Sequence, residues 1–216
     1  MADEQQGRPA RPGAAAIVLA AGESRRFGAQ KLLMPFGGST VLGCVITALD
    51  AAGLRPTIIV VGADAAVAEW VAREARSARI ARNPDASRGM LSSVRVGVAA
   101  LPDQVERFVI ALGDQPTLRA EGIAHLLREQ LRLGKGIALP TYGGKRGHPV
   151  VFAARYREPI MALAACPAGD ARTLRDLIHA HHDDVAEVAS DSDAVLRDVD
   201  TRDEYQDELR RLASDP

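Results

Sequence analysis

An apolar segment near the N-terminus stops abruptly at a glycine and passes into a cationic loop. The run Ala16–Leu19 is rich in residues favoured in strands, Gly22 follows two alanines, and Lys31 stands nine positions later. This pattern predicts a buried parallel strand that opens into a ligand-binding loop. We expect Gly22 and Gly28 to adopt positive φ, so that successive backbone N–H groups point at phosphate oxygens. A strand followed by a solvated basic turn is the plainer alternative.

The cationic side chains of this loop suit a nucleoside triphosphate. Arg25, Arg26 and Lys31 supply positive charge, and hydrogen bonds between ionised groups are among the strongest in proteins. Neither common glycine-rich phosphate pattern is present, because Lys31 precedes Leu32 rather than Ser or Thr and no G-x-G-x-x-G follows the strand. The sequence therefore predicts a triphosphate-binding loop of another type.

The overall charge balance excludes a chain built to coat nucleic acid or an anionic membrane. The 216 residues include 27 basic and 28 acidic side chains, for a net charge of −1. Cys44 and Cys166 are too few and too far apart for a disulfide framework or a metal site, which favours a reducing compartment. No apolar run approaches the ~20 residues of a membrane span. We expect a cytoplasmic protein with a small-molecule substrate.

Strand-like apolar runs alternate with helical periodicity, which predicts an α/β fold with helices on both faces of a mostly parallel sheet. Residues 1–13 lack the apolar core of a signal peptide and are predicted to be a disordered tail, with a single domain over 14–216. The expected strands cover 15–19, 57–61, 78–82, 107–112, 137–140, 149–152 and 185–188. Two of the expected helices begin at the caps Ser39 and Asp64, and a third contains Ile123, Leu126, Leu127 and Leu131. The other expected helices cover 91–101, 171–180 and 202–212.

Asp114 is the first candidate for chemistry. It follows the apolar run 107–112 and Gly113, so its carboxylate stands at the end of a rigid strand. Ligands of such sheets bind beyond the carboxyl ends of the strands, and Mg²⁺ is held by one or two carboxylates together with phosphate oxygens and water. A helix N-cap is the alternative role for an aspartate at this position.

A second carboxylate is expected near the C-terminus. Asp200 ends a short β-like run and precedes a helix that Thr201 could cap, while Asp198 alternates with it on the same predicted face. The choice between Asp198 and Asp200 stays open at this stage. An ordinary acidic helix start is the plainer interpretation.

Two further polar positions lie near the predicted ligand edge. The helix that begins after Gly89 carries Ser92, whose hydroxyl and the neighbouring backbone N–H groups could hold a base or a phosphate. His148 stands between a glycine and a strand, where it could contact an acceptor substrate. By contrast, the residues 179–184, which are rich in His and Asp, are interpreted as a solvated helix end.

Five segments, taken together, resemble the molybdenum cofactor cytidylyltransferase group of nucleotidyltransferases. They run from Ile17 to Tyr205, in the family's order and at family-like spacing, and read L-A-A-G-E-S-R-R-F-G-A-Q-K, R-G-M-L-S-S, G-D-Q-P, G-H-P-V and D-V-D-T-R-D-E-Y. The resemblance implies a three-layer, Rossmann-like nucleotidyltransferase fold and Mg²⁺-dependent transfer of CMP from CTP to the phosphate of molybdopterin, with release of pyrophosphate. Related guanylyltransferases tend to show Leu-Ala-Gly-Gly where this chain has Leu-Ala-Ala-Gly, which favours CTP over GTP.

The resemblance also implies roles for individual residues. Nucleotide binding falls to Leu19, Ala20, Ala21, Gly22, Ser24, Arg25, Lys31, Ser92 and Asp114. It implies that Arg25, Lys31 and Asp114 are catalytic and that Asp114 and Asp200 bind Mg²⁺.

The acceptor is where the chain departs from its relatives. They often carry Gly-Asp-x-Gly-x-Arg late in the chain, where this sequence reads Gly-Asp-Ala-Arg over 169–172. The same subfamily includes nicotine blue oxidoreductases. Transfer to another small phosphate (guanylyl, sugar or alcohol phosphate) is therefore an alternative, as is a non-catalytic cofactor chaperone that docks on a molybdenum hydroxylase. Hydride transfer is a third, against which the missing dinucleotide glycine pattern counts.

Overall fold

The computed structural model describes residues 13–22, 27, 30–163 and 173–214. Within these residues, no helix combines the length and the apolar character needed to cross a membrane. The strands are β1 (Ala15–Ala20), β4 (Thr57–Val61), β5 (Arg79–Arg82), β6 (Arg107–Leu112), β7 (Ile137–Tyr142), β8 (Lys145–Arg146), β9 (Val150–Ala153) and β10 (Val185–Ala189). A separate pair is formed by β2 (Pro35–Phe36) and β3 (Ser39–Thr40).

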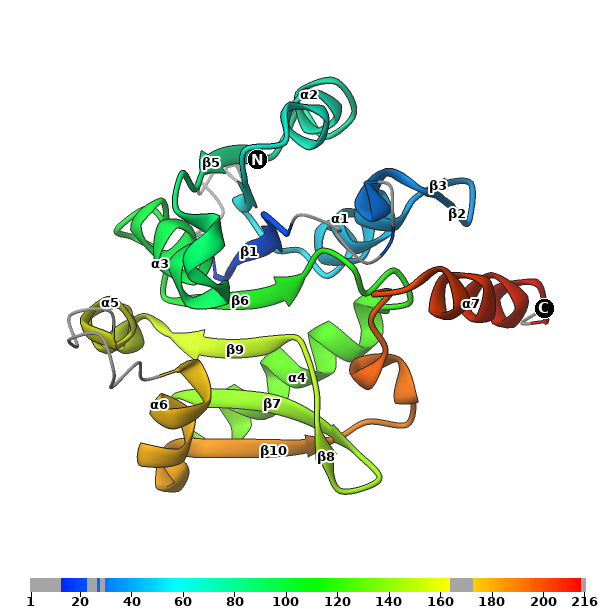
Figure 1. Cartoon of the computed structure of the whole chain (residues 1–216). Helices are drawn as coiled ribbons and strands as arrows, with labels where there is room; N and C mark the ends of the chain where they lie inside the picture. The colour runs from blue at the N-terminus through cyan, green and yellow to red at the C-terminus, as the bar shows by residue number, and fades with distance from the viewer. Residues whose placement is uncertain (1–12, 23–26, 28–29, 164–172, 215–216) are drawn as a thin grey trace, which may run out of the picture.

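One mixed sheet forms the middle layer of the molecule. Its strand order is β10-β7-β9-β6-β1-β4-β5, with β8 beside β7 (Figure 1). The pairs on both sides of β1 are parallel, as are β4 with β5 and β7 with β10. Strand β9 runs antiparallel to both of its neighbours, β6 and β7. The predicted α/β architecture with a mostly parallel sheet is confirmed.

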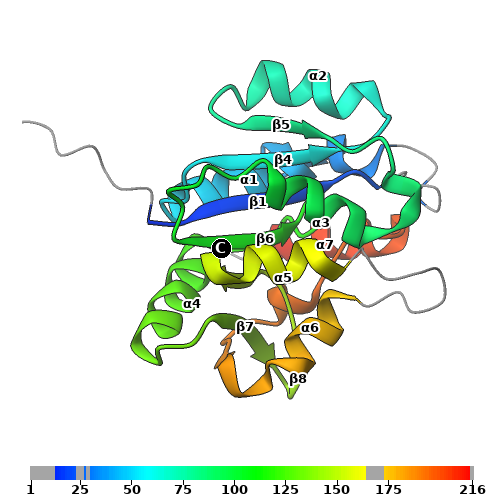
Figure 2. The same cartoon turned by 90° about the vertical axis from the view of Figure 1, so that its left-hand side faces the viewer.

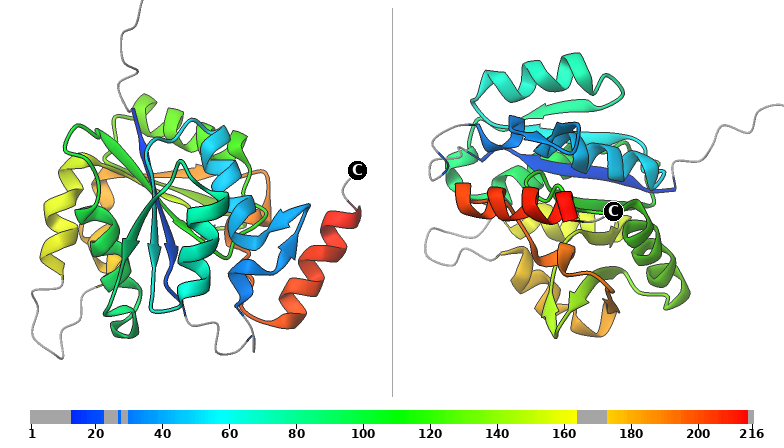
Figure 3. Two further views of the ribbon diagram at one scale, coloured as in Figure 1. Left: turned by 90° about the horizontal axis from the view of Figure 1, so that it is seen from above. Right: turned by 90° about the vertical axis from the view of Figure 1, so that its right-hand side faces the viewer.

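Helices cover both faces of this sheet. One face carries α1 (Val41–Ala51), α2 (Ala65–Glu74), α4 (Ala120–Arg132) and α7 (Arg202–Ser214); the other carries α3 (Met90–Ala99), α5 (Arg157–Ala162) and α6 (Leu174–Ala180). Figure 2 looks onto the α3, α5 and α6 face, and the right panel of Figure 3 looks onto the side with α1 and α7. Successive side chains of a strand point to opposite faces, so Val18 packs in one core and Ile17 in the other.

One detail of the expected helices is wrong. Thr40, rather than Ser39, caps α1: its Oγ1 accepts a hydrogen bond from Gly43 N at 3.1 Å, whereas Ser39 pairs in the β2–β3 hairpin. On α4 the buried stripe continues from Ile123 and Leu126 to Gln130, at the i, i+3, i+7 spacing of one helix face, which leaves Leu131 62% exposed.

The carboxyl edge of the sheet gathers segments that lie far apart in the chain. Strands β1 and β6 both end there, and antiparallel β9 begins there, which places His148 at the same edge. After β10 the chain passes through η6 (Asp193–Leu196) and crosses this edge. Val199 N donates a 2.9 Å hydrogen bond to the carbonyl of Asp114, and His148 N donates one of 2.8 Å to the carbonyl of Val195. These bonds fasten the C-terminal segment to the turn after β6 and to the residues just before β9.

Close packing of α3 on the sheet depends on Gly97. A Cβ at this position would lie 2.3 Å from Ile17 Cγ2 and 3.1 Å from Val60 Cγ2. We expect Gly97→Ala to lower the free energy of unfolding by about 1 kcal/mol, because overpacking outweighs the better helix propensity of alanine. On α4, a Cβ at Gly122 would meet nothing within 4 Å, so Gly122→Ala should instead raise the free energy of unfolding slightly. Urea denaturation compares the two, and equal stabilisation by both would contradict this packing.

Candidate active site

Lys31 is at the centre of a charged cluster at the carboxyl edge. It begins η1 (Lys31–Leu33), and its Nζ lies 2.7 Å from Asp114 Oδ2 and 2.8 Å from Asp200 Oδ1. Its side chain is only 10% exposed. Burial lowers the pKa of Lys31, but the charges and hydrogen bonds of Asp114 and Asp200 together outweigh that effect and raise the pKa above its ordinary value. The ammonium is therefore charged at neutral pH and joins the end of β6 to the segment before α7.

Three carboxylates share this site. Asp114, Asp198 and Asp200 each offer an oxygen, and these atoms all lie within 4.8 Å of one another. Burial, together with the negative charges of Asp114 and Asp200, raises the pKa of Asp198. The sequence left Asp198 and Asp200 as alternatives; the structure brings both to Asp114, although no strand forms over 197–200.

The donor set fits a divalent cation. Asp114 Oδ2 accepts from Lys31, but its Oδ1 is buried and has no hydrogen-bond partner among the described residues. A buried carboxylate oxygen without a partner is costly, and Mg²⁺ takes oxygen ligands from one or two carboxylates. Asp114 with Asp198 and Asp200 therefore has the chemistry to hold such an ion.

A cavity of about 570 Å³ opens beside the carboxylates. Its walls come from the end of β1, from η1, from the end of β6 and from the loop that leads through η2 (Ala86–Arg88) into α3. Of the predicted nucleotide-binding residues, Leu19, Ala21, Gly22, Lys31 and Asp114 line it, and so does Asp200. Ala20 does not line it and is packed in the core.

The backbone of Gly22 differs from expectation. Gly22 is not among the glycines with positive φ, so that prediction is wrong; it lines the open cavity, where a Cβ would meet nothing within 4 Å. The positive φ in the cavity wall belongs to Gly89, at +100°, directly before α3. Ser24, Arg25 and Gly28, with Arg26, Cys166 and residues 169–172, lie outside the described residues.

The start of α3 presents Ser93, rather than Ser92, to the cavity. Ser92 Oγ lies 2.8 Å from the carbonyl of Gly89 and 3.0 Å from that of Asp85, which ties it to its own loop. Asn83 is buried and donates from Nδ2 to Ser92 Oγ and Ser93 Oγ, at 2.8 and 2.9 Å. Sequence reasoning missed Ser93, although the helical spacing from Met90, which also lines the cavity, was a usable signal.

His148 is half-buried near the acidic cluster. Burial lowers its pKa, and the negative charge of Asp114 opposes that effect. The imidazole is therefore mainly neutral at neutral pH. It is not among the residues that line the cavity described above.

The histidine-rich segment 179–184 is only partly a solvated helix end. His182 is exposed, but Asp184 accepts hydrogen bonds from Tyr156 Oη at 2.6 Å and from Gly136 N at 2.8 Å. His181 packs edge-on against the Tyr156 ring, with the centroids 5.3 Å apart. These contacts account for the segment as a structural junction.

Residues 16–185 match the model of the MobA-like NTP transferase domain. The chain belongs to this family. It is 33% identical over 163 residues to nicotine blue oxidoreductase of Paenarthrobacter nicotinovorans, covering 72% of this chain and 76% of that protein. It is 26% identical over 190 residues to molybdenum cofactor cytidylyltransferase of Escherichia coli K12, covering 88% of this chain and 92% of that protein. As a member of this family, the chain is a nucleotidyltransferase.

Solved structures of the same size share the fold. The homologue of Rv0371c from Mycobacterium sp. strain JC1 superposes with a TM-score of 0.79 at 29% identity, over 94% of this chain and 98% of that one. Rv0371c of Mycobacterium tuberculosis H37Rv, solved in complex with manganese, has a TM-score of 0.73 at 27% identity, over 92% and 98%. That manganese complex and the acidic cluster here both point to a divalent metal.

We expect Lys31→Met to destabilise the metal-free protein by about 1–3 kcal/mol. Removing the ammonium leaves neighbouring carboxylates without their counter-charge, and the exposure of Asp200 keeps the loss below the ~3–5 kcal/mol of a fully buried pair. Excess Mg²⁺ should then raise the unfolding temperature of the variant more than that of the wild type. Thermal unfolding by circular dichroism tests both points, with exposed Lys145→Met as the control. Wild-type stability of Lys31→Met without Mg²⁺ would contradict the expectation.

Proposed function

We propose that this nucleotidyltransferase moves CMP from CTP to the terminal phosphate of molybdopterin, the organic part of the molybdenum cofactor, and releases pyrophosphate. One observation carries the proposal. Lys31 and three carboxylates converge beside a cavity whose walls are the glycine-ended strand β1 and the start of α3. Such a site offers metal ligands and a buried cation next to space for a nucleotide.

The cavity suits the nucleotide. The apolar Leu19 and the small Ala21 and Gly22 would lie against the base and ribose, and Ser93 adds a hydroxyl to the lining of the same cavity. The triphosphate would extend towards Lys31, and by family resemblance Ser24 and Arg25 would hold it as well. CTP is favoured by the Leu-Ala-Ala-Gly segment and by the similarity to the Escherichia coli cytidylyltransferase.

The chemistry is an in-line displacement without a covalent intermediate. An oxygen of the acceptor phosphate forms a bond to the α-phosphorus of CTP, and the bond to the oxygen that bridges to the β-phosphate breaks with its electron pair, releasing pyrophosphate. The Lys31 ammonium, with Arg25, would stabilise the negative charge that develops on that leaving group. Asp114, with Asp200 or Asp198, would hold Mg²⁺, which supplies neutralisation of the triphosphate charge when bound.

The acceptor would approach from the side of His148, beyond the end of β6. We place the reaction in the cytoplasm and the product's use in a molybdenum hydroxylase as parts of the same proposal. These parts are supported by the family resemblance and by the similarity to a molybdenum cofactor enzyme.

Pyrophosphate release tests the reaction. The wild-type protein is incubated with Mg²⁺ and each of CTP, GTP, ATP and UTP, with and without molybdopterin. We expect pyrophosphate release with CTP when the acceptor is present. In Asp114→Asn, which removes a charged metal ligand, the rate of release should fall by about 10²- to 10⁴-fold. Release with other acceptors would support a different phosphate substrate. Cofactor binding without CTP consumption would support a chaperone, and NAD(P)H-dependent reduction of a dye would support an oxidoreductase.

His148→Ala should raise the KM for the acceptor by about tenfold and leave the KM for CTP within twofold, because a neutral imidazole contributes about one hydrogen bond. Steady-state kinetics with each substrate varied in turn measures both constants. His125→Ala, an exposed histidine on α4, is the control. An equal change in both constants, or none, would remove His148 from the acceptor site.

A further inference from the structure

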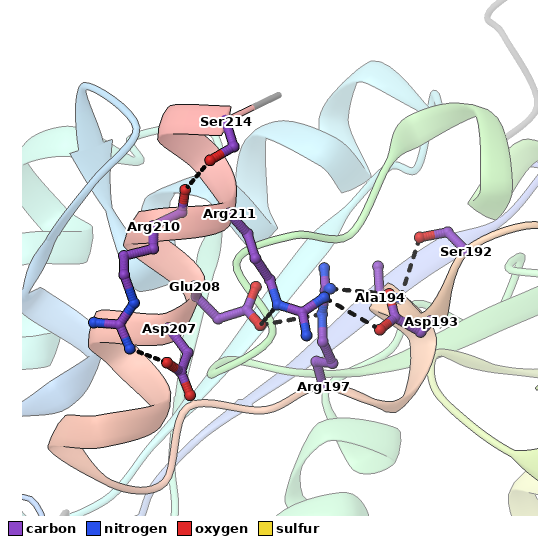
Figure 4. Close-up of polar contacts among 9 residues, drawn as sticks. All are labelled: Ser192, Asp193, Ala194, Arg197, Asp207, Glu208, Arg210, Arg211 and Ser214. Carbon is purple, nitrogen blue, oxygen red and sulfur yellow. Dashed lines mark hydrogen bonds and ion pairs between the residues drawn. The ribbon is translucent and has the colours of Figure 1, made fainter. Parts of the chain in front are cut away.

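Helix α7 is fastened to the chain that carries Asp198 and Asp200 by a buried acidic side chain. Glu208 is only 6% exposed, and its Oε1 lies 3.1 Å from Arg197 Nε, as an ion pair without the alignment of a hydrogen bond (Figure 4). Arg197 also pairs with Asp193 of η6 at 2.9 Å, and Arg211 reaches the same Asp193 at 3.4 Å. Arg197 directly precedes Asp198, so this network meets the main chain next to the metal-binding carboxylates.

The same helix holds the other end of this short segment. Glu204, one turn before Glu208, accepts hydrogen bonds through Oε2 from Asp200 N at 2.9 Å and from Thr201 N at 2.7 Å. Between them, Val199 is fully buried and donates its N–H to the carbonyl of Asp114. Three sets of contacts therefore hold the backbone over 197–201. Two of them come from Glu204 and Glu208 of α7, and the third is the hydrogen bond from Val199 to Asp114.

Helix α7 also contacts the loop that leads to Lys31. The Arg202 Nε donates to the carbonyl of Phe27 at 3.1 Å, and the Tyr205 ring packs edge-on against Phe27 with the centroids 5.8 Å apart. Tyr205 Oη donates to the carbonyl of Pro35 at 2.5 Å. One helix thus contacts the chain on both sides of Lys31, at Phe27 and Pro35, and also the backbone N–H of Asp200.

A contribution to the stability of the fold does not by itself explain the buried ion pair between Glu208 and Arg197. Burial raises the pKa of Glu208, although Arg197 and Arg211 oppose that effect. One of its oxygens, Oε2, is buried with no partner among the described residues. Well-packed apolar residues often replace a buried ion pair with no loss of stability, and a fixed geometry is one reason to retain it. The match to the family model also ends at residue 185, before this network begins.

We propose that Glu208 is a positioning residue for the metal site: through Arg197 it fixes the backbone that places Asp198 and Asp200 beside Asp114. It does not touch the cavity and takes no part in the chemistry. The inference rests on the proposed function, because it requires that these carboxylates hold the metal.

The test is Mn²⁺ binding to the full chain, measured by titration calorimetry and by the electron paramagnetic resonance signal of free Mn²⁺, with and without CTP. We expect Glu208→Gln to raise the Kd for Mn²⁺ by about 10- to 100-fold, the range for groups that orient metal ligands. Asp207→Asn is the matched control: it removes the same charge from the same helix, from a side chain that is 59% exposed and pairs with Arg210. Its Kd should stay within twofold of the wild type.

A second variant distinguishes a positioning role of Glu208 from a contribution to stability alone. The double change Arg197→Met with Glu208→Leu removes both buried charges, so it should recover thermal stability lost in Glu208→Gln while Mn²⁺ binding stays weak. All titrations are made well below the unfolding temperature of each variant. If Glu208→Gln or the double variant binds Mn²⁺ as tightly as the wild type, the positioning role is overturned.

Asp114→Asn distinguishes this outcome from a failure of the proposed metal site. It should abolish specific Mn²⁺ binding. Wild-type binding in Asp114→Asn would overturn the site itself and the positioning role with it. Loss of binding in Asp114→Asn together with normal binding in Glu208→Gln would overturn the positioning role only.

Discussion

The contact of the Lys31 ammonium with Asp114 and Asp200 is the constraint on which the rest of the site depends. These partners are 83 and 169 residues from Lys31 in the chain. Three carboxylates within 4.8 Å of one another repel strongly when ionised, so a cation must stand among them for the edge of the sheet to keep its shape. Lys31 supplies that charge without a metal. Lys31 also lines the cavity in which we propose that the triphosphate binds.

The sheet topology explains why these groups can meet. Parallel β1 and β6 are neighbours and end at one edge, and the reversed direction of β9 brings His148 to that edge as well. The C-terminal segment then crosses the end of β6, held by Val199 and by α7. The part of the chain that matches the family model contributes Lys31 and Asp114, while Asp198 and Asp200 lie beyond its end.

Much of the fold could be predicted because local patterns decided it. Strands β1, β4 and β6 are mainly apolar runs that are buried along most of their length, and Asp64 caps α2 as its sequence position indicated. The predictions were wrong at positions where contacts with neighbouring segments decide the local conformation. Ser39 and Thr40 are both good caps, and the β2–β3 hairpin takes Ser39; Gly22 could have taken a positive φ, but the chain leaves β1 without needing one.

By itself, the sequence determined the α/β layering, the strand ends that line the cavity, and Lys31 and Asp114 as charged groups at that edge, because hydrophobic period and residue chemistry act locally. Tertiary structure alone decided that both Asp198 and Asp200 reach Asp114, that Ser93 lines the cavity in place of Ser92, and that Glu208 is buried against Arg197. Each of these depends on how one element packs against another distant in the chain. Such packing follows from the summed burial and charge of the whole fold, which no short stretch of sequence contains.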